Sequence, residues 1–382
     1  MSRWRFILLP LTLTGFFLGL MLLPGLDLLF DINPFPPLVE NRFLKGFPPW
    51  PRTLSEVQQF PGEFDAWLND HIRFRSFGVR TLNLLKYSLA NVSSNPGVVA
   101  GKDRFLFVAE SNLTYHLAIE PFSESELRRW LEWLEHTQRW LADQGTTFIL
   151  VIVPSKAGIY PEKLPDWWRQ QGKKKRWDQL RDSLTARQSP LLWLDLTSTM
   201  LEFKLRGEPV YFRRDSHWTH LGAYYGTMAI LSFLELLCES VGKQIPRLSF
   251  SDVKSSLYMP DQSKYLGIEL VWYDSDYLRL PLVPEAWLER NYAFVPVKPQ
   301  VDYARRFPFA VGNGRPEAPT AVVFHDSFGR FLFNQLGPHF RWCIFWHYRN
   351  GFDPVLLEKT RPDFCLWIMA DRMLQNWVPP SN

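Results

Sequence analysis

The chain has 382 residues, of which 46% are hydrophobic and 16% aromatic, enough for a substantial folded core. The net charge of +4 is small for this length and no long basic run occurs, so nucleic acid is not expected as a partner. The three cysteines are widely spaced and form neither a zinc motif nor a disulfide framework.

The N-terminus carries an uncharged apolar run from Phe6 to Leu26. About 20 such residues suffice to cross a bilayer as a helix. Arg3 and Arg5 precede the run and acidic residues follow it, so the N-terminus is expected to stay in the cytoplasm. A cleaved signal peptide is the rival interpretation, but its apolar region is typically shorter, about 7–15 residues. Residues 1–30 are therefore predicted to be a cytoplasmic stub and transmembrane signal anchor.

The next segment, residues 31–55, is rich in proline. Proline disrupts a regular helix and favours an extended chain, so a linker is predicted. Apolar residues then recur at helical spacing from Phe60 to Leu89, which predicts a helix. Two apolar runs broken around Gly101 predict a β-hairpin in residues 98–108.

The remaining chain alternates between predicted helices and predicted buried strands. Ser123 and Glu126 have the spacing of a capping box at a helix start, and a long apolar helix is predicted from Leu221 to Cys238. The predicted buried strands are "TTFILVIVP", "LLWLDL", "TAVVFHDSFG", "RWCIFWHY" and "RPDFCLWIMADR". This alternation predicts an α/β fold with a mainly parallel sheet. Residues 242–318 depart from it and are predicted to be an insertion within a folded domain of residues 56–382.

A nucleophile is suggested where one of these strands ends. Ser327 follows an apolar strand directly and precedes a predicted helix, the setting in which the nucleophilic serine of an α/β hydrolase lies. The main-chain N–H groups of Phe328, Gly329 or Ser327 itself are candidates to bind a developing oxyanion, assisted by the helix dipole. An Asp-Ser pair is also a frequent helix cap, so the motif alone leaves both roles open.

A base and its orienting acid are suggested by the run "RRDSHWTHLGA". A serine hydroxyl needs a base, and the base needs a carboxylate to orient it. Asp215 and His217 lie two residues apart, so their side chains would point the same way in an extended segment. Asp215 is alternatively a cap for the following helix. A zinc site of Asp215, His217, His220 and His325 is a weaker alternative because the spacing matches no known zinc motif.

The motifs together resemble the alginate O-acetyltransferase AlgX/AlgJ family of SGNH-hydrolase-like proteins. The resemblance rests on an Asp-x-His-Trp-Thr-x-x-Gly-Ala run upstream of a strand that ends in Asp-Ser-Phe. Further similar stretches are "ENRFLKGFPPWP", "FDAWLNDHIRFRS", "GKDRFLFVAE", "VPSKAGIYPEKLP" and "RPDFCLWIMADRML". Two departures stand out. Arg104 occupies a family glycine position, and Ala370-Asp371-Arg372 replaces the usual Glu-Arg.

The resemblance implies a three-layer α/β/α SGNH-like fold with Asp215, His217 and Ser327 as the catalytic triad. Lys156 and Tyr160 match the family's Val-Pro block and are candidate pocket residues. The resemblance is closer to the membrane-anchored AlgJ type, which implies a catalytic domain in the periplasm, held by one helix in the inner membrane. No cofactor or metal is expected, and the sequence does not identify the acetyl donor.

The implied activity is transfer of acetyl, through an acetyl-serine, to hydroxyls of an exported polysaccharide. A membrane-bound O-acyltransferase is the implied partner that supplies the acetyl group. The same triad would also serve a carbohydrate esterase, because the outcome depends on whether water or a sugar hydroxyl meets the intermediate. A non-catalytic glycan-binding or scaffold subunit is a further alternative.

Overall fold

The computed structural model describes residues 3–30, 32, 44–109, 114–168, 172–238, 242–246, 248–250, 254–278, 295 and 308–379. The chain forms two compact units. Unit 1 comprises Met1–Pro96 and Asp261–Trp272, and unit 2 comprises Gly97–Pro260 and Tyr273–Asn382. The single domain expected over residues 56–382 is thus divided between the two, because residues 56–96 and a short later segment pack with each other.

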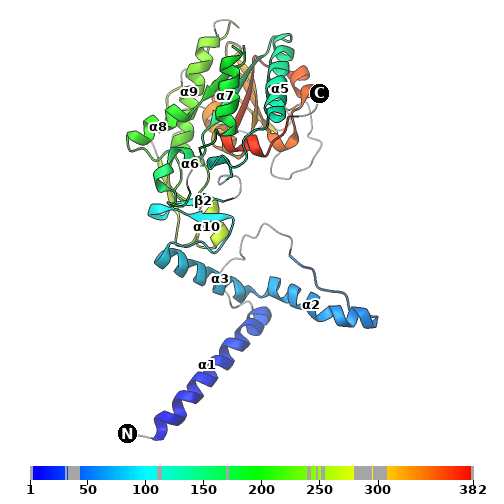
Figure 1. Cartoon of the computed structure of the whole chain (residues 1–382), viewed down its shortest axis with the longest axis vertical. Helices are drawn as coiled ribbons and strands as arrows, with labels where there is room; N and C mark the ends of the chain where they lie inside the picture. The colour runs from blue at the N-terminus through cyan, green and yellow to red at the C-terminus, as the bar shows by residue number, and fades with distance from the viewer. Residues whose placement is uncertain are drawn as a thin grey trace. The chain divides into compact units, whose positions relative to one another are not determined.

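The described part of unit 1 is helical (Figure 1). Its helices are α1 (Arg3–Phe30), α2 (Leu54–His71), α3 (Arg73–Leu85), a π-helical turn (Lys86–Ala90) and α10 (Asp261–Leu266). The helix expected from Phe60 begins six residues earlier, where Thr53 and Glu56 form a capping box, and it is interrupted at Ile72. Of the predicted linker, residues 31 and 33–43 lie outside the described residues, and residues 44–52 form no helix or strand.

Among the described residues, two helices are long and apolar enough to cross a membrane. In α1 the span is Pro10–Asp27, of which 6% is buried. The other is α9 (His220–Cys238), of which 56% is buried, as expected for a core helix of unit 2. The apolar N-terminal helix predicted from the sequence is therefore present.

The predicted hairpin opens unit 2 as β1 (Val98–Ala100) and β2 (Leu106–Val108), paired antiparallel. A Cβ on Gly101 would lie 2.3 Å from the carbonyl oxygen of Lys163, so only glycine fits there. Arg104 has a φ of 62°, the left-handed region that glycine adopts without steric cost. The departure noted at this position therefore places a non-glycine residue in a glycine-type conformation.

The core of unit 2 is a six-stranded sheet in the order β4-β3-β10-β8-β9-β7. Its strands are β3 (Thr147–Val153), β4 (Leu192–Asp195), β7 (Phe309–Val311), β8 (Thr320–His325), β9 (Trp342–His347) and β10 (Phe364–Ala370). All neighbours are parallel except β7, which pairs antiparallel with β9. The five strands predicted from apolar runs are all present, and the mainly parallel sheet is confirmed. Strands β8 and β10 are buried along their whole length, which explains their continuous apolar sequences.

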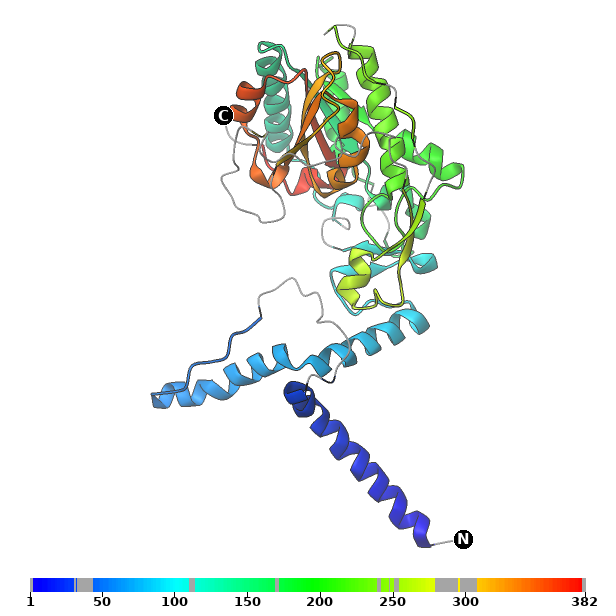
Figure 2. The same ribbon diagram turned by 180° about the vertical axis from the view of Figure 1, so that it is seen from behind.

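Helices cover both faces of this sheet, as Figures 1 and 2 show from opposite sides. One layer contains α5 (Glu124–Ala142), α7 (Arg176–Ala186) and α12 (Pro354–Thr360), and the other contains α9 and α11 (Phe333–Leu336). The chain moves one way across the sheet from β3 to β4 and the other way from β8 to β9. Because parallel crossovers are right-handed, these opposite directions place α7 and α11 on opposite faces. The three-layer α/β/α architecture follows.

The segment predicted as an insertion contains a second, two-stranded sheet. Strands β5 (Lys254–Tyr258) and β6 (Asp274–Leu278) pair antiparallel, and Tyr258 lies opposite Asp274. The sixth strand of the main sheet, β7, also belongs to this segment. Residues 279–294 and 296–307 lie outside the described residues.

Candidate active site

Ser327 lies at the turn that follows β8, where a helix of the 3-10 type covers Ser327–Phe331. Asp326 caps this turn. One of its carboxylate oxygens accepts the Phe328 N–H at 2.9 Å, and the other accepts the Ala370 N–H at 2.9 Å at the end of β10. Burial raises the pKa of Asp326 against the opposing effect of these two bonds. Asp326 therefore serves as the cap, and Ser327 itself is an exposed residue.

The helix predicted after Ser327 is only this 3-10 turn of five residues followed by the four-residue α11, so a helix dipole provides little help. The N–H of Phe328 is bonded to the Asp326 carboxylate and that of Gly329 to the Asp326 carbonyl at 3.1 Å. Neither expected oxyanion donor is therefore available in this geometry. The third candidate, the Ser327 N–H, has no acceptor among the described residues.

Gly329 has a packing role instead. A Cβ built on it would lie 2.4 Å from the ring of His325, directly beneath the turn. The His325 ring is buried and its Nδ1 hydrogen bonds to the Asp326 carbonyl at 2.7 Å. Burial lowers the pKa of His325 to about 4, so this ring is neutral at pH 7.

Asp215 and His217 lie on the segment that precedes α9. The segment is a series of bends rather than the extended chain expected, yet the two side chains meet. The carboxylate of Asp215 accepts both the main-chain N–H of His217 at 3.0 Å and its Nδ1–H at 2.6 Å. An antiparallel bridge between Tyr211 and Trp218 closes the loop at its base. Asp215 is fully buried, and His217 is 5% exposed.

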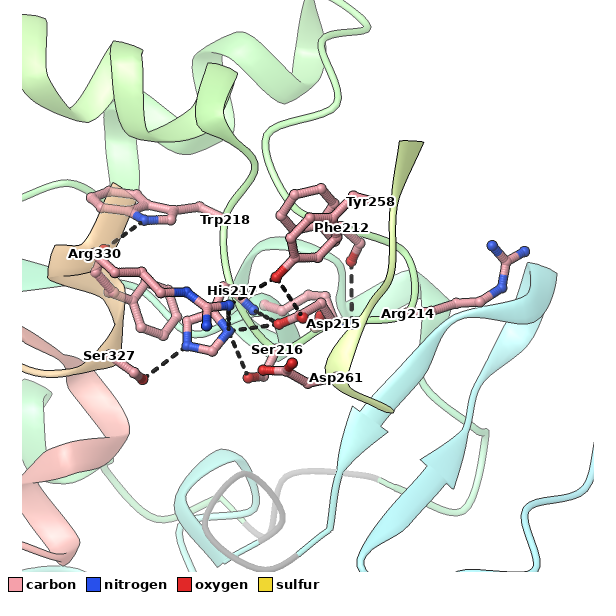
Figure 3. Close-up of polar contacts among 12 residues, drawn as sticks. Phe212, Arg214, Asp215, Ser216, His217, Trp218, Tyr258, Asp261, Ser327 and Arg330 are labelled. Atoms are coloured by element: carbon pink, nitrogen blue, oxygen red, sulfur yellow. Dashed lines mark hydrogen bonds and ion pairs between the residues drawn. The ribbon is translucent and has the colours of Figure 1, made fainter. Parts of the chain in front are cut away.

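The structure brings this pair to Ser327, 110 residues away in sequence (Figure 3). The Nε2 atom of His217 lies 2.8 Å from Ser327 Oγ. Since Nδ1 donates to the carboxylate, Nε2 is left to accept the serine proton. The three residues thus lie in the order and at the distances that nucleophile activation requires.

Trp218 connects the loop to the turn from the next position in the motif. Its indole N–H donates to the Phe328 carbonyl at 3.2 Å, and the ring is fully buried. A Cβ on Gly226 would lie 2.8 Å from this ring, so the glycine leaves the space that the indole fills. The cap at the start of α9 is Thr219, whose hydroxyl accepts the Gly222 N–H at 2.9 Å. Asp215 is therefore not needed as a helix cap.

Lys156, expected in the pocket, is instead completely buried beneath the loop. Its Nζ donates to the carbonyl of Asp215 at 2.6 Å, to those of Phe212 and Arg213 at 3.3 and 3.2 Å, and to that of Leu106. Burial lowers the pKa of Lys156 to about 7, although the carboxylates of Asp215 and Asp274 oppose this. The side chain therefore supports the loop from within.

Tyr160 is also buried rather than part of a pocket. Its ring contacts that of Tyr211 with centroids 6.3 Å apart, and the Lys204 ammonium lies 4.8 Å from its centroid. Burial raises the pKa of Tyr160 to about 12. Both residues of the Val-Pro block thus contribute to the packing around the site.

The four residues considered as a zinc site do not converge. His220 is bonded to Asp276 through Nδ1, and His325 is bonded to the Asp326 carbonyl. His217 is occupied on both ring nitrogens by Asp215 and Ser327. Among the described residues, these three histidines therefore make separate local contacts.

The β5–β6 hairpin supplies polar partners that the sequence reading missed. Asp274 forms a buried ion pair with Arg214 at 2.6 Å and accepts its main-chain N–H at 2.7 Å. Tyr258 donates its hydroxyl to Asp215 at 3.1 Å. The alternation of acidic residues in "DSD" at positions 274–276 was the one signal available, because it places two carboxylates on one face of a strand.

Comparisons with known proteins agree with this fold. Residues 98–257 match the family model described as "SGNH hydrolase-like domain, acetyltransferase AlgX". The matched residues contain Asp215 and His217 but not Ser327. A "Probable alginate O-acetylase AlgJ" from Pseudomonas putida is 30% identical over 178 residues, 44% of this chain and 40% of the relative.

A protein of the same description from Pseudomonas aeruginosa is 26% identical over 197 residues, 51% of this chain and 45% of the relative. The chain therefore matches less than half the length of each of these two relatives. Among solved structures, PatB1 of Bacillus cereus has a TM-score of 0.50 at 15% identity, covering 72% of this chain and 96% of PatB1. These findings confirm the SGNH-like α/β fold and the resemblance to the AlgX/AlgJ family that the motifs indicated.

Proposed function

We propose that this chain is a serine O-acetyltransferase that modifies an exported polysaccharide. The observation that carries the proposal is the hydrogen-bonded series Asp215–His217–Ser327, with contacts of 2.6 and 2.8 Å. The names of the relatives, which describe alginate O-acetylases, support an acidic polysaccharide as acceptor. Ser327, an exposed residue at the carboxyl end of a strand of the mainly parallel sheet, is in the position where such folds bind substrates.

The first half-reaction acetylates the enzyme. Ser327 Oγ attacks the carbonyl carbon of an acetyl donor, and its proton passes to Nε2 of His217. Asp215 stabilises the resulting imidazolium through Nδ1–H. The tetrahedral intermediate then expels the leaving group, which takes the proton from His217, and acetyl-Ser327 remains. The Ser327 N–H is our candidate for one oxyanion donor, since it has no acceptor among the described residues.

The second half-reaction reverses these roles. A sugar hydroxyl attacks the acetyl-serine carbonyl, and His217 takes its proton. Collapse of this second intermediate breaks the bond to Ser327 Oγ, which recovers the proton from His217. Acetyl leaves on the sugar, and no cofactor is consumed in either step.

The same chemistry yields an esterase if water replaces the sugar. Exposure of Ser327 favours this second candidate, because water reaches an exposed acyl-serine readily. The two activities differ only in the acceptor. Their separation therefore requires an experiment in which acceptor and water compete.

That experiment uses the full-length chain in detergent, p-nitrophenyl acetate as donor and alginate oligosaccharides as acceptor. A transferase moves acetyl to the oligosaccharide, with a yield that rises with acceptor concentration. Acetate as the only product at every acceptor concentration would identify an esterase instead. Ser327→Ala is the control and should yield neither product above the uncatalysed background. If this variant formed as much product as the wild type, both enzyme hypotheses would fail, and a non-catalytic glycan-binding subunit would be the remaining interpretation.

The proposed location is the periplasm, with α1 as a single-pass anchor in the inner membrane. The support is an apolar span, Pro10–Asp27, preceded by Arg3 and Arg5. The implied supplier of acetyl is a membrane-bound O-acyltransferase. A reporter fused after Asn382 should be active only if it functions outside the cytoplasm. Activity of a reporter that works only in the cytoplasm would contradict this topology.

A further inference from the structure

The hairpin formed by β5 and β6 presents one face to the segment that carries Asp215 and His217. Tyr258 and Asp274 are direct cross-strand partners, and Asp276 lies two residues beyond Asp274, so all three side chains share a face. Each contacts this segment. Tyr258 bonds to Asp215, Asp274 to Arg214, and Asp276 accepts the main-chain N–H of His220 at 3.1 Å.

Of the three, Tyr258 is the one whose side chain contacts the carboxylate of Asp215 (Figure 3). Its ring stacks on Phe212 with centroids 4.0 Å apart and planes at 10°, which fixes the direction of the hydroxyl. That hydroxyl lies 3.1 Å from Asp215 Oδ2 and 2.8 Å from Nη2 of Arg330.

The direction of these two hydrogen bonds follows from their chemistry. A guanidinium has only donors, so Arg330 must donate and the Tyr258 oxygen must accept. The single hydroxyl proton of Tyr258 is then directed to Oδ2 of Asp215. The other oxygen, Oδ1, already accepts two N–H groups of His217. Both oxygens of the carboxylate therefore have donors, and its orientation toward the imidazole is fixed.

We infer that Tyr258, oriented by Arg330, is a positioning residue that holds the Asp215 carboxylate in the geometry needed to orient His217. This inference rests on the proposed function. Arg330 lies on the same turn as Ser327, three residues later. The contacts thus form a closed series that leads from Arg330 through Tyr258, Asp215 and His217 to Ser327. In this way the β5–β6 hairpin, which lies outside the main sheet, links the two segments that supply the proposed triad.

Tyr258→Phe tests this role because it removes the hydroxyl and keeps the ring that stacks on Phe212. In full-length protein, we expect kcat for acetyl release from p-nitrophenyl acetate to fall about 10-fold, the usual effect of one hydrogen bond to a charged group. KM should stay within about twofold, because the hydroxyl contacts no reacting atom. Tyr273→Phe, at an exposed tyrosine just before β6, is the matched control and should leave kcat unchanged.

A double-mutant cycle distinguishes positioning from a general structural effect. If Tyr258 acts through Asp215, then Tyr258→Phe should change kcat less than about twofold in an Asp215→Ala background. An undiminished loss in that background would overturn the inference, as would a wild-type rate for Tyr258→Phe. The inference would also be overturned if the thermal unfolding midpoint of Tyr258→Phe were low enough that unfolding at the assay temperature accounts for the loss of kcat. Failure of the wild type to become acetylated on Ser327 would instead remove the proposed function itself, and this inference with it.

Discussion

The turn that carries Ser327 and the loop that carries Asp215 and His217 are stabilised by different parts of the chain. The turn continues a fully buried strand, and the Asp326 carboxylate ties it to the neighbouring strand β10. The loop belongs to no strand of the main sheet. It depends on side chains from elsewhere in the chain, chiefly Lys156 beneath it and Asp274 of the hairpin, which pairs with Arg214 of the loop.

This difference indicates that the two parts of the site depend on different interactions. A nucleophile on a strand end is placed by the sheet, so its position follows from the core. The proposed base and acid, His217 and Asp215, are placed by a few buried polar contacts, each of which is costly to break. We therefore expect substitutions around the loop to have large effects on both stability and activity.

The largest effect should come from removing the group that joins the two regions. His217→Ala removes the base, and the rate of Ser327 acetylation should fall by about four to six orders of magnitude, since the members of a triad act as a unit. Asp215→Ala should cost less, because the carboxylate orients the imidazole and accepts no proton. Stopped-flow release of p-nitrophenol measures both rates. Equal losses for the two variants would argue against the assigned order of roles.

The next effect concerns the ion pair that holds the loop to the hairpin. Arg214 and Asp274 are each about 6% exposed in their side chains, and burial raises the pKa of Asp274. Arg214→Ala leaves this carboxylate buried without its cation, so the free energy of unfolding should fall by about 3–5 kcal/mol. Arg206→Ala, at the exposed Arg206–Glu202 pair, is the control and should cost at most about 0.5 kcal/mol. Urea denaturation at pH 7 measures both, and equal losses would contradict the comparison.

A pH-dependent effect is expected beneath the Ser327 turn. His325 has its pKa lowered to about 4 by burial, against 6.5 in the unfolded chain. Between these values the unfolded chain binds more protons, so the free energy of unfolding decreases as pH falls. This histidine alone contributes up to about 3 kcal/mol of that decrease. Asp326 acts in the opposite sense, since its raised folded-state pKa favours the folded form at low pH.

His325→Gln should therefore flatten the pH dependence. Urea denaturation of wild type and variant at pH 6.5 and near pH 4 measures the difference. His116 and His339, whose pKa values are also lowered to about 4, remain in both proteins, so part of the slope persists. Identical slopes in the two proteins would show that the folded state does not keep His325 neutral.

The smallest of the expected effects comes from the ammonium beneath the loop. Lys156→Met leaves the carbonyls of Phe212, Arg213 and Asp215 without this donor but also removes a charge that is costly to bury. The net loss should be about 1–3 kcal/mol in the free energy of unfolding, together with slower acetylation of Ser327. Lys204→Met, at a lysine that reaches the carbonyl of Ile159 from a less buried position, is the control. A stable Lys156→Met variant with unchanged acetylation would show that the loop holds its shape without this contact.

The sequence predicted the sheet well because its strands are buried on both faces and read as continuous apolar runs. It also indicated Asp215, His217 and Ser327, since residue type and spacing carry the chemistry of a triad. It missed β7, a three-residue strand with no distinctive pattern. It placed Lys156 and Tyr160 in a pocket because a local motif does not reveal which side of a loop a side chain supports.

The contacts that the β5–β6 hairpin makes with the loop could not be predicted, because they depend on how separate segments of the chain pair. Tyr258 and Asp274 reach the loop only through a cross-strand pairing between distant segments, and Asp215 lies 43 residues from Tyr258 in sequence. Two of the three expected oxyanion donors are engaged elsewhere for a local reason. The Asp326 side chain and carbonyl engage the N–H groups of Phe328 and Gly329, which a predicted helix start does not reveal.

The central claim is that His217 activates Ser327 as a nucleophile, and peptide mapping by mass spectrometry tests it most directly. Full-length protein is mixed briefly with p-nitrophenyl acetate, quenched in acid and digested. We expect one acetyl group on the peptide that contains Ser327, none on that peptide in Ser327→Ala, and only a trace in His217→Ala. Two results would contradict the account. One is acetylation of the Ser327 peptide in His217→Ala at the same rate as in the wild type, and the other is no acetylation of that peptide in the wild type.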